Sequence, residues 1–216
     1  MIMKQNLINR ISELKKFVNI IESRVDIWLL DLRNICDEER VLSFQLLDKE
    51  EKRRATNFSF ISDRDRFTLC RSLSKIILSS YCGSPPAMVQ ISYEKYGKPY
   101  LPTTFSIHFN ISHTHNWGIL CVSRESPVGV DIEYMNESII LSDILTIFSS
   151  KEEQEWVYEH NTKERFFTLF TSKEALLKAQ GIGFLGEHIP SMKPIQNGKL
   201  ALKEFCYEDY NNDRTV

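Results

Sequence analysis

Hydrophobic positions at helical spacing open the chain. Apolar residues recur every three or four positions through residues 1–22, which predicts an amphipathic leading helix. The same spacing returns between Phe67 and Tyr81 and predicts a longer helix over residues 63–81. Two prolines, Pro85 and Pro86, follow it and cannot continue a helix, so we expect it to end before them.

Between the helical segments, apolar residues alternate with polar ones or form short apolar runs, as in strands. We expect strands over residues 24–32, 89–93, 106–111, 117–122 and 128–133. A final helical pattern covers residues 161–180 and ends at Gly181, since glycine commonly follows a helix. The order of elements therefore recurs in two halves, residues 25–125 and residues 126–216, behind the leading segment 1–24.

Two short sequence patterns indicate helix starts. Asp48 with Glu51, and Ser150 with Glu153, each place a short oxygen-bearing side chain three residues before a glutamate, which is the pattern of a capping box. The first opens a basic segment, in which lysine and arginine are dense between residues 49 and 71. In a chain of net charge −2, this local excess of cations predicts an anionic partner.

Bulk composition narrows the class of protein. The chain has 216 residues, of which 42% are hydrophobic, so a sizeable core can form. Its slightly acidic balance argues against general nucleic-acid binding, and it has neither a membrane-length apolar run nor a signal-peptide pattern. Five scattered cysteines suit reduced thiols. We expect a cytoplasmic protein without a membrane or nucleic-acid partner.

Paired carboxylates follow the apolar run at residues 127–130. Asp131 and Glu133 would face the same way in a strand, and parallel carboxylates repel each other unless a cation or proton lies between them. Oxygen ligands without nearby cysteine favour magnesium, or manganese, over zinc. The alternative is a solvated strand face without a metal.

A second pair of charges lies in the final helix. Glu174 and Lys178 are four residues apart and share a helix face, so a carboxylate and an ammonium can converge on one ligand. A carboxylate that binds a hard cation, beside a lysine that neutralises phosphate oxygens, suits phosphoryl chemistry. The alternative is an ordinary solvent-facing ion pair.

Polar turns complete the candidate chemistry. Ser112 and His113 end a strand in a turn that can anchor a phosphate. Alternatives are a zinc site through His113 and His115, which lacks a third ligand nearby, and a serine–histidine nucleophile pair, whose adjacent members point apart. Gly97 and Lys98 form a turn with an exposed lysine. The sequence contains no P-loop or dinucleotide-binding glycine motif.

Taken in order, the segments GKPYLP, FNISHT, PVGVDIE and FTSKEALLKAQGIG resemble the 4′-phosphopantetheinyl transferases, in particular the larger monomeric type that activates nonribosomal peptide and polyketide synthetases. The resemblance runs from Lys49 to Phe184. It implies an α+β fold of two similar α/β halves in a pseudo-two-fold arrangement, with coenzyme A bound between them. Because the chain ends soon after Phe184, we expect a second half shortened at its C-terminus.

The resemblance also implies a function. The enzyme would transfer the 4′-phosphopantetheine group from coenzyme A to a serine of an apo-acyl or peptidyl carrier protein, releasing adenosine 3′,5′-bisphosphate. Asp131, Glu133 and Glu174 would hold magnesium, and Lys178 would contact the phosphates. The serine proton would pass to Glu174 or to a metal-bound water. The alternative is a catalytically impaired module that binds coenzyme A or a carrier protein.

The family pattern further implies residues that bind coenzyme A. His113 and Arg66 would meet its 3′-phosphate. The other residues implied in coenzyme A binding are Lys49, Lys52, Gly97, Lys98 and Ser112. Phe170 stands where the family usually has tryptophan, from which we expect only packing changes. The carrier would dock after Glu133 and around residues 148–156.

Overall fold

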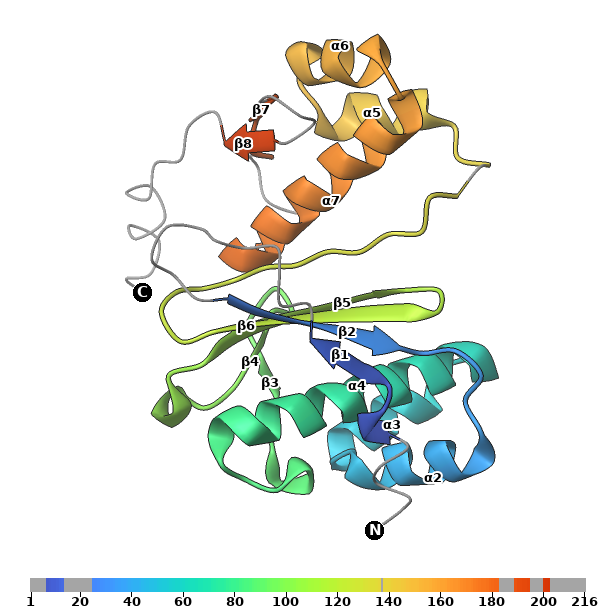
Figure 1. Cartoon of the computed structure of the whole chain (residues 1–216), viewed down its shortest axis with the longest axis vertical. Helices are drawn as coiled ribbons and strands as arrows, with labels where there is room; N and C mark the ends of the chain where they lie inside the picture. The colour runs from blue at the N-terminus through green and yellow to red at the C-terminus, as the bar shows by residue number, and fades with distance from the viewer. Residues whose placement is uncertain (1–6, 14–24, 137, 183–188, 195–199, 203–216) are drawn as a thin grey trace. The chain divides into compact units, whose positions relative to one another are not determined.

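The structure is a computed structural model that describes residues 7–13, 25–136, 138–182, 189–194 and 200–202. Contacts divide the chain into two compact units: unit 1 comprises Met1–Tyr134 with Glu174–Gly183, and unit 2 comprises Met135–Lys173 with Phe184–Val216. The first stretch of unit 1 ends at Tyr134, so the segment that carries Asp131 belongs to unit 1. Helix α7, Thr162–Gln180, contributes to both units (Figure 1).

A four-stranded antiparallel sheet forms the centre of unit 1. Its strands are ordered β1-β2-β6-β5. Their bounds are Ile11–Glu13 for β1, Val25–Asp31 for β2, His108–Thr114 for β5 and Trp117–Ser123 for β6. Strands β5 and β6 form a hairpin in which Ser112 lies opposite Ile119. The register matters for the site because it fixes which residues of β5 share a face.

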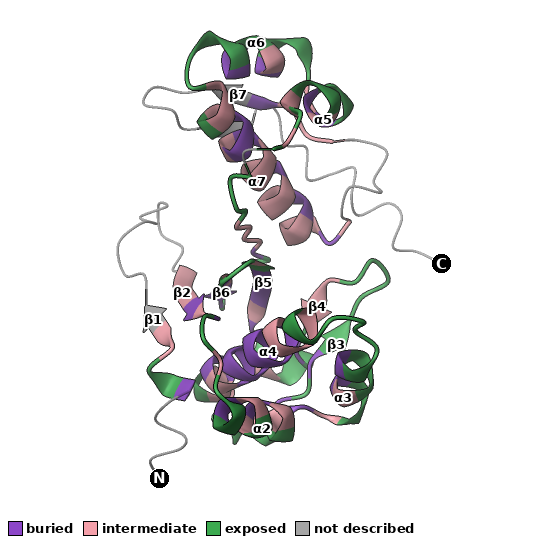
Figure 2. Ribbon diagram, turned by 90° about the vertical axis from the view of Figure 1, so that its right-hand side faces the viewer, coloured by how far each residue is buried: buried purple, intermediate pink, exposed green. Residues whose placement is uncertain are grey.

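Three helices accompany this sheet, namely α2 over Asp37–Leu46, α3 over Lys49–Thr56 and α4 over Ile61–Cys82. Helix α4 is largely buried (Figure 2) and shares one hydrophobic core with the strands. The approach is close at Gly118, where a Cβ would lie 3.2 Å from Cys70 Sγ. Gly83 ends α4 with φ +63°, a conformation that glycine adopts without strain.

Short elements connect α4 to β5. They are a 3-10 turn at Pro86–Met88, strands β3 at Ser92–Tyr93 and β4 at Pro99–Tyr100, and a 3-10 turn at Thr103–Phe105. The two strands pair as a small antiparallel hairpin. The strand predicted over residues 89–93 is thus confirmed only at its end.

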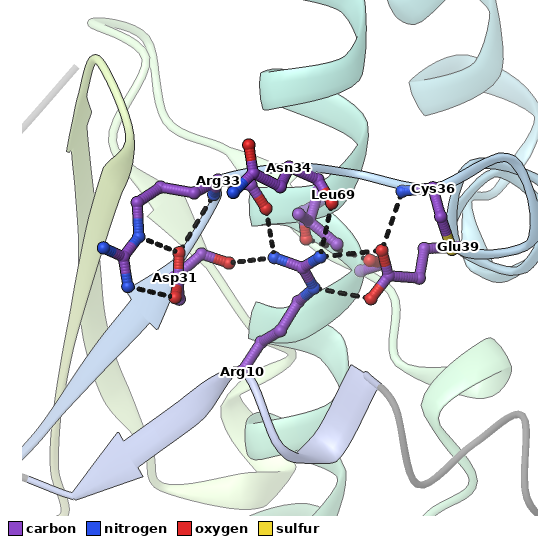
Figure 3. A network of polar contacts seen from close by, with 8 residues as sticks. Arg10, Asp31, Arg33, Asn34, Cys36, Glu39 and Leu69 are labelled. Carbon is purple, nitrogen blue, oxygen red and sulfur yellow. Dashed lines mark hydrogen bonds and ion pairs between the residues drawn. The ribbon is translucent and has the colours of Figure 1, made fainter.

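Arg10 attaches the N-terminal segment to the rest of unit 1 (Figure 3). Its Nε and Nη2 donate to the two carboxylate oxygens of Glu39 at 2.6 and 2.7 Å, and its Nη1 donates to the Arg33 carbonyl at 2.6 Å. Burial favours a higher pKa for Glu39, but its pKa is lowered because the hydrogen bonds with Arg10 and Cys36 and the charge of Arg10 together outweigh burial. A bidentate arginine–carboxylate pair of this kind fixes geometry as well as charge.

The predicted leading helix is wrong at Ile11–Glu13, which form strand β1 and pair with Trp28–Leu30 of β2. The rest of the predicted helix lies largely outside the described residues. The apolar spacing does reflect burial, since Leu7 is buried in the core. The strand forms because its backbone groups pair with the edge of β2, a distant partner that a local sequence pattern does not reveal.

Unit 2 combines helices with a short hairpin. Its elements are α5 over Leu141–Phe148, α6 over Lys151–Glu159, α7 as far as Lys173, and strands β7 at Met192–Pro194 and β8 at Leu200–Leu202. Aromatic rings dominate its core: Phe148 meets Phe166 edge-on at 5.7 Å and Phe170 at 5.4 Å between centroids. Phe170 therefore packs in this core.

The mixture of helices and antiparallel strands confirms an α+β fold. The segment 127–136 has no assigned strand, although a strand was predicted over residues 128–133, because β5 holds it through side chains instead of a backbone ladder. Among the described residues, no helix combines the length and the apolar character that crossing a membrane would require.

Candidate active site

Strand β5 holds the segment with the paired carboxylates through alternate side chains. Asn110 Oδ1 accepts a hydrogen bond from the Val130 N–H at 3.1 Å, and Ser112 Oγ donates to Asp131 Oδ1 at 2.6 Å. Thr114, the next residue on the same face of the strand, accepts from the backbone N–H of Tyr134 at 3.2 Å. These contacts line up the segment along β5 and fix the position of Asp131.

Gly129 allows helix α7 to approach this segment. A Cβ at Gly129 would lie 1.9 Å from the carbonyl oxygen of Ala175 and 2.5 Å from the backbone nitrogen of Ala179. No side chain fits at such distances, so glycine is required by the contact itself. The close approach brings the final turns of α7, which carry Glu174 and Lys178, to Asp131.

Lys178, Asp131 and Ser112 meet in one polar cluster. Lys178 Nζ lies 2.5 Å from Asp131 Oδ1 and 3.0 Å from Ser112 Oγ. The Asp131 side chain is only 2% exposed, and its second oxygen, Oδ2, is buried without a hydrogen-bond partner among the described residues. A buried carboxylate oxygen left in this state is costly unless a cation or donor reaches it.

The charge of Asp131 affects two further carboxylates, those of Glu133 and Glu174. The pKa of Glu133 is raised by burial and then by the charge of Asp131. The pKa of Glu174 is also raised by burial; Lys178 opposes this increase, while Asp131 and Glu133 add to it. The structure thus brings the three predicted metal ligands within electrostatic range of one another.

These carboxylates are candidate metal ligands. In the described part of the chain, no three His, Cys, Asp or Glu side chains are already arranged to hold a metal ion. The donor set nevertheless fits magnesium. Its atoms are carboxylate oxygens, and one of them is buried without a partner among the described residues. Burial, with a smaller contribution from mutual repulsion, raises the pKa of Glu133 and Glu174.

His113 points away from this cluster, toward a group of arginines. His113 and Phe109 lie on the same face of β5, whereas Ser112 lies on the other face. Phe109 belongs to the hydrophobic core that also contains residues of α4. The pKa of the solvent-accessible His113 is lowered by desolvation of its ring and then by four cations, Arg66, Lys178, Arg54 and Arg71. Arg66 is thus one of the charges that act on His113, and their joint contact with a phosphate stays a prediction. Ser112 and His113 lie on opposite faces of β5, as predicted.

The predicted lysines of α3 lie elsewhere. Lys49 is exposed at the start of the helix, and Lys52 Nζ lies over the Phe44 ring at 5.7 Å. Neither is among the charges that lower the pKa of His113. The capping box offered a sequence signal for Arg54, which does act on His113. Glu51 of that box is buried, and Arg54, three positions later, shares its face of the helix.

Lys98 was predicted to be exposed beside the co-substrate. It is half-buried, and its Nζ donates to the Ala179 carbonyl at the end of α7. Burial lowers its pKa, which the nearby Glu94 opposes. Gly97 adopts φ +84° in the turn before it. A lysine at a helix C-terminus interacts favourably with the exposed carbonyls and the helix dipole, so Lys98 helps to fix the end of α7.

Comparison with known proteins identifies the family to which the chain is similar. A model described as the 4′-phosphopantetheinyl transferase superfamily matches residues 127–210, and one described as 4′-phosphopantetheinyl transferase, N-terminal, matches residues 34–125. The chain is 30% identical to the 4′-phosphopantetheinyl transferase HetI of Nostoc sp. over 191 residues, which is 85% of this chain and 80% of the relative.

Two relatives from Bacillus subtilis agree. The 4′-phosphopantetheinyl transferase Sfp is 30% identical over 170 residues, 77% of this chain and 74% of its own length. Another 4′-phosphopantetheinyl transferase is 32% identical over 150 residues, 68% of this chain and 65% of its own length. The chain belongs to the 4′-phosphopantetheinyl transferase superfamily.

Proposed function

We propose that the chain transfers the 4′-phosphopantetheine group from coenzyme A to a serine hydroxyl of an apo carrier protein, in a magnesium-dependent reaction that releases adenosine 3′,5′-bisphosphate. The observation that carries this proposal is the buried, unpartnered Asp131 Oδ2, beside which Glu174 and Lys178 lie on one helix. Family membership supports the reaction, and these residues supply groups for it.

Asp131, Glu133 and Glu174 would hold Mg²⁺, with Mn²⁺ as an alternative. When bound, the metal would neutralise charge on the pyrophosphate of coenzyme A. Lys178 is partly exposed, at 28%, so its ammonium can contact both Asp131 and a phosphate. It would stabilise the negative charge that develops on the departing 5′-phosphate.

Glu174 is the best candidate for the general base. Its carboxylate shares a helix face with Lys178, and a carboxylate can take up the proton of an attacking hydroxyl. The carrier serine oxygen would form a bond to the β-phosphorus as the bond from that phosphorus to the bridging oxygen breaks. The hydroxyl proton would pass to Glu174, and the electron pair would leave with the adenosine bisphosphate. The nucleophile would belong to the partner.

The remaining assignments concern binding. His113 and Arg66 would meet the 3′-phosphate, while Ser112 and Gly97 would lie near the co-substrate. Lys49 and Lys52 would make peripheral contacts to its phosphates. The carrier would dock after Glu133 and around residues 148–156; the exposed Tyr134 and Met135 support the first of these regions. We further propose a cytoplasmic monomer.

A transfer assay tests the proposal. Apo carrier protein, coenzyme A and magnesium are incubated with the protein, and mass spectrometry should show a gain of one phosphopantetheine group on the carrier. Asp131→Asn keeps the shape of the side chain and should lower the rate at least about 100-fold. Arg53→Met, an exposed change on α3, is the matched control. Binding of coenzyme A and carrier without any mass gain would favour the catalytically impaired module.

A further inference from the structure

The tip of the β5–β6 hairpin contacts the segment that carries Glu133. His115 and Asn116 form the turn between the two strands, and Thr114 is the last residue of β5 before it. The Thr114 oxygen accepts from the backbone N–H of Tyr134 at 3.2 Å, and its hydroxyl donates to Glu133 Oε2 at 3.4 Å. One side chain of the hairpin tip therefore holds both the backbone and the carboxylate of this segment.

The two contacts of Thr114 use different parts of its hydroxyl group. A hydroxyl has one hydrogen to donate and two lone pairs that accept. Because the oxygen accepts the N–H of Tyr134, the hydrogen remains available to Glu133, with which the structure pairs it. This second contact is long for a hydrogen bond between two oxygens, and hydrogen bonds of this kind in active sites commonly shorten once the substrate is bound.

Thr114 completes a row of polar side chains on one face of β5. The other members are Asn110, which holds the backbone of the neighbouring segment, and Ser112, which donates to Asp131. Since residues two apart in a strand face the same way, the row has the same spacing in sequence as Asp131 and Glu133. Each of these two carboxylates therefore has its own hydroxyl donor on β5, Ser112 for the first and Thr114 for the second.

His115 supports the contact from the turn. Its φ is +42°, which is uncommon for a residue other than glycine and persists where the surrounding contacts fix it. The centroid of its ring lies 4.2 Å from that of Tyr134, with 37° between the ring planes. Contact between two aromatic rings is favourable. It therefore holds Tyr134, and with it the backbone next to Glu133, against the hairpin tip.

Glu133 gains from such a contact because it is exposed. Asp131, by contrast, is buried and is held by Ser112 and by Lys178, whose Nζ lies 2.5 Å from it. An exposed glutamate side chain samples several rotamers, and it loses this freedom when it binds a ligand. A donor that restrains the carboxylate beforehand reduces that entropic cost. Thr114 is placed to be this donor.

We propose that Thr114 is a positioning residue whose hydroxyl orients the Glu133 carboxylate for the divalent metal, and that the contact of His115 with Tyr134 supports it. The inference rests on the proposed function, because it takes Glu133 as a metal ligand. Thr114 would act through Glu133, without touching the metal or the co-substrate. Hydrogen-bond partners of metal ligands commonly contribute about 10- to 100-fold to metal affinity.

Titration with Mn²⁺ tests this role without any transfer reaction. Free Mn²⁺ is measured by electron paramagnetic resonance at a fixed concentration of coenzyme A, and a titration without protein gives the metal that coenzyme A binds by itself. Thr114→Val keeps the shape of the side chain but has no donor, so it should weaken Mn²⁺ binding about 10-fold. Thr114→Ser keeps the hydroxyl and should bind Mn²⁺ nearly as tightly as the unaltered protein.

His115→Asn tests the supporting contact. Asparagine tolerates the left-handed backbone conformation but has no aromatic ring to place against Tyr134. We expect its Mn²⁺ affinity to lie between those of the unaltered protein and Thr114→Val, because the hydroxyl remains and only its support is lost. An affinity equal to that of the unaltered protein would overturn the part of the proposal that concerns His115.

Thr104→Val is the matched control, because it makes the same chemical change at an exposed threonine in the 3-10 turn before β5. It should leave Mn²⁺ binding unchanged. Unaltered Mn²⁺ affinity in Thr114→Val would overturn the proposal, and so would an equal loss in Thr114→Val and Thr114→Ser. If Thr114→Val does not fold, unaltered affinity in Thr114→Ala overturns the proposal equally.

A merely structural role for Thr114 predicts a different pattern. It would weaken the binding of coenzyme A measured by calorimetry without a divalent metal, whereas the positioning role leaves that binding unchanged. In the transfer reaction, Thr114→Val should raise the Mg²⁺ concentration needed for half-maximal rate, and excess Mg²⁺ should restore most of the rate. A rate that excess Mg²⁺ does not restore would contradict the positioning role.

The transfer assay separates this inference from the proposed function. Mn²⁺ binding that depends on the Thr114 hydroxyl, without any transfer to an apo carrier, would support the positioning role and refute the enzyme. Transfer by a protein whose Mn²⁺ affinity is the same in Thr114→Val would support the enzyme and refute the positioning role.

Discussion

Each unit contains a buried lysine that pairs with the glutamate of a capping box. In unit 1, Lys75 of α4 reaches Glu51 at the start of α3, with Nζ to Oε2 at 2.8 Å. In unit 2, Lys173 of α7 reaches Glu153 at the start of α6, also at 2.8 Å. In both cases a long helix is attached to the first turn of the short helix that precedes it in the chain.

The two pairs differ in how completely they are satisfied. Glu153 Oε1 accepts from the backbone N–H of Met192 at 2.6 Å, and Lys173 Nζ also donates to the Phe148 carbonyl at 2.8 Å. In unit 1, by contrast, Glu51 Oε1 has no hydrogen bond in the described structure and lies beside a second cation, Arg71. A saturated, charge-balanced pair serves stability, whereas the unbalanced pair leaves positive charge for a ligand.

The largest effect should come from breaking the saturated pair. Lys173→Met leaves the Glu153 carboxylate charged and buried, and we expect the free energy of unfolding to fall by about 3–5 kcal/mol. Urea denaturation followed by circular dichroism measures the loss. The double variant Lys173→Met with Glu153→Met removes both charges and should recover much of it. A single variant as stable as the unaltered protein would contradict the importance of this pair.

The corresponding change in unit 1 should cost less. In Lys75→Met, Glu51 retains Arg71 as a partner, so we expect a loss of about 1–3 kcal/mol in the same denaturation experiment. A loss larger than that of Lys173→Met would reverse the comparison, because it would mean that Arg71 cannot serve as the counter-ion of Glu51.

A third lysine tests how the end of α7 is held. Lys98→Met removes the donor to the Ala179 carbonyl at the C-terminus of the helix, and we expect a loss of about 0.3–1 kcal/mol. Lys98→Arg should retain most of the stability. If Lys98 bound phosphate instead, its replacement would raise the KM for coenzyme A without affecting unfolding.

The smallest effect should appear in the pH dependence of stability. The folded-state pKa of His113 lies below its ordinary value of about 6.5, so as the pH falls through that value the unfolded chain takes up a proton first. Stability is therefore lost on acidification, and His113→Gln should lose less of it between pH 7.5 and 5.5. A residual slope is expected from His108, whose pKa is also lowered. If stability depended on pH equally in the unaltered protein and in His113→Gln, His113 would not be a source of this pH dependence.

Features with local signals were predictable from the sequence. The helix over residues 63–81, the strands over residues 106–111 and 117–122 and both capping boxes follow from periodicity and residue type, and the structure confirms them. The motifs around His113, Asp131 and Glu174 were sufficient for the family, which the comparisons confirm. The α+β class is likewise confirmed.

Features that depend on distant partners were not predictable. Strand β1 exists because β2 offers an unpaired edge, and the segment with Asp131 is held by side chains of β5. Arg54 and Arg71 act on His113, and whether a cation of α3 or α4 can do so depends on which face of its helix is covered. Lys98 appeared exposed because the helix end that covers it lies 81 positions away in the chain.

Gly129 has a consequence for how the protein is made. It packs against Ala175 and Ala179, so unit 1 is assembled from two stretches of chain that are separated in sequence by residues 135–173 of unit 2. During translation the sheet of unit 1 can form early. The helical segment that packs against Gly129 is missing until residues 174–183 have left the ribosome. A fragment that stops at Tyr134 would contain the whole sheet and only half of the chemistry.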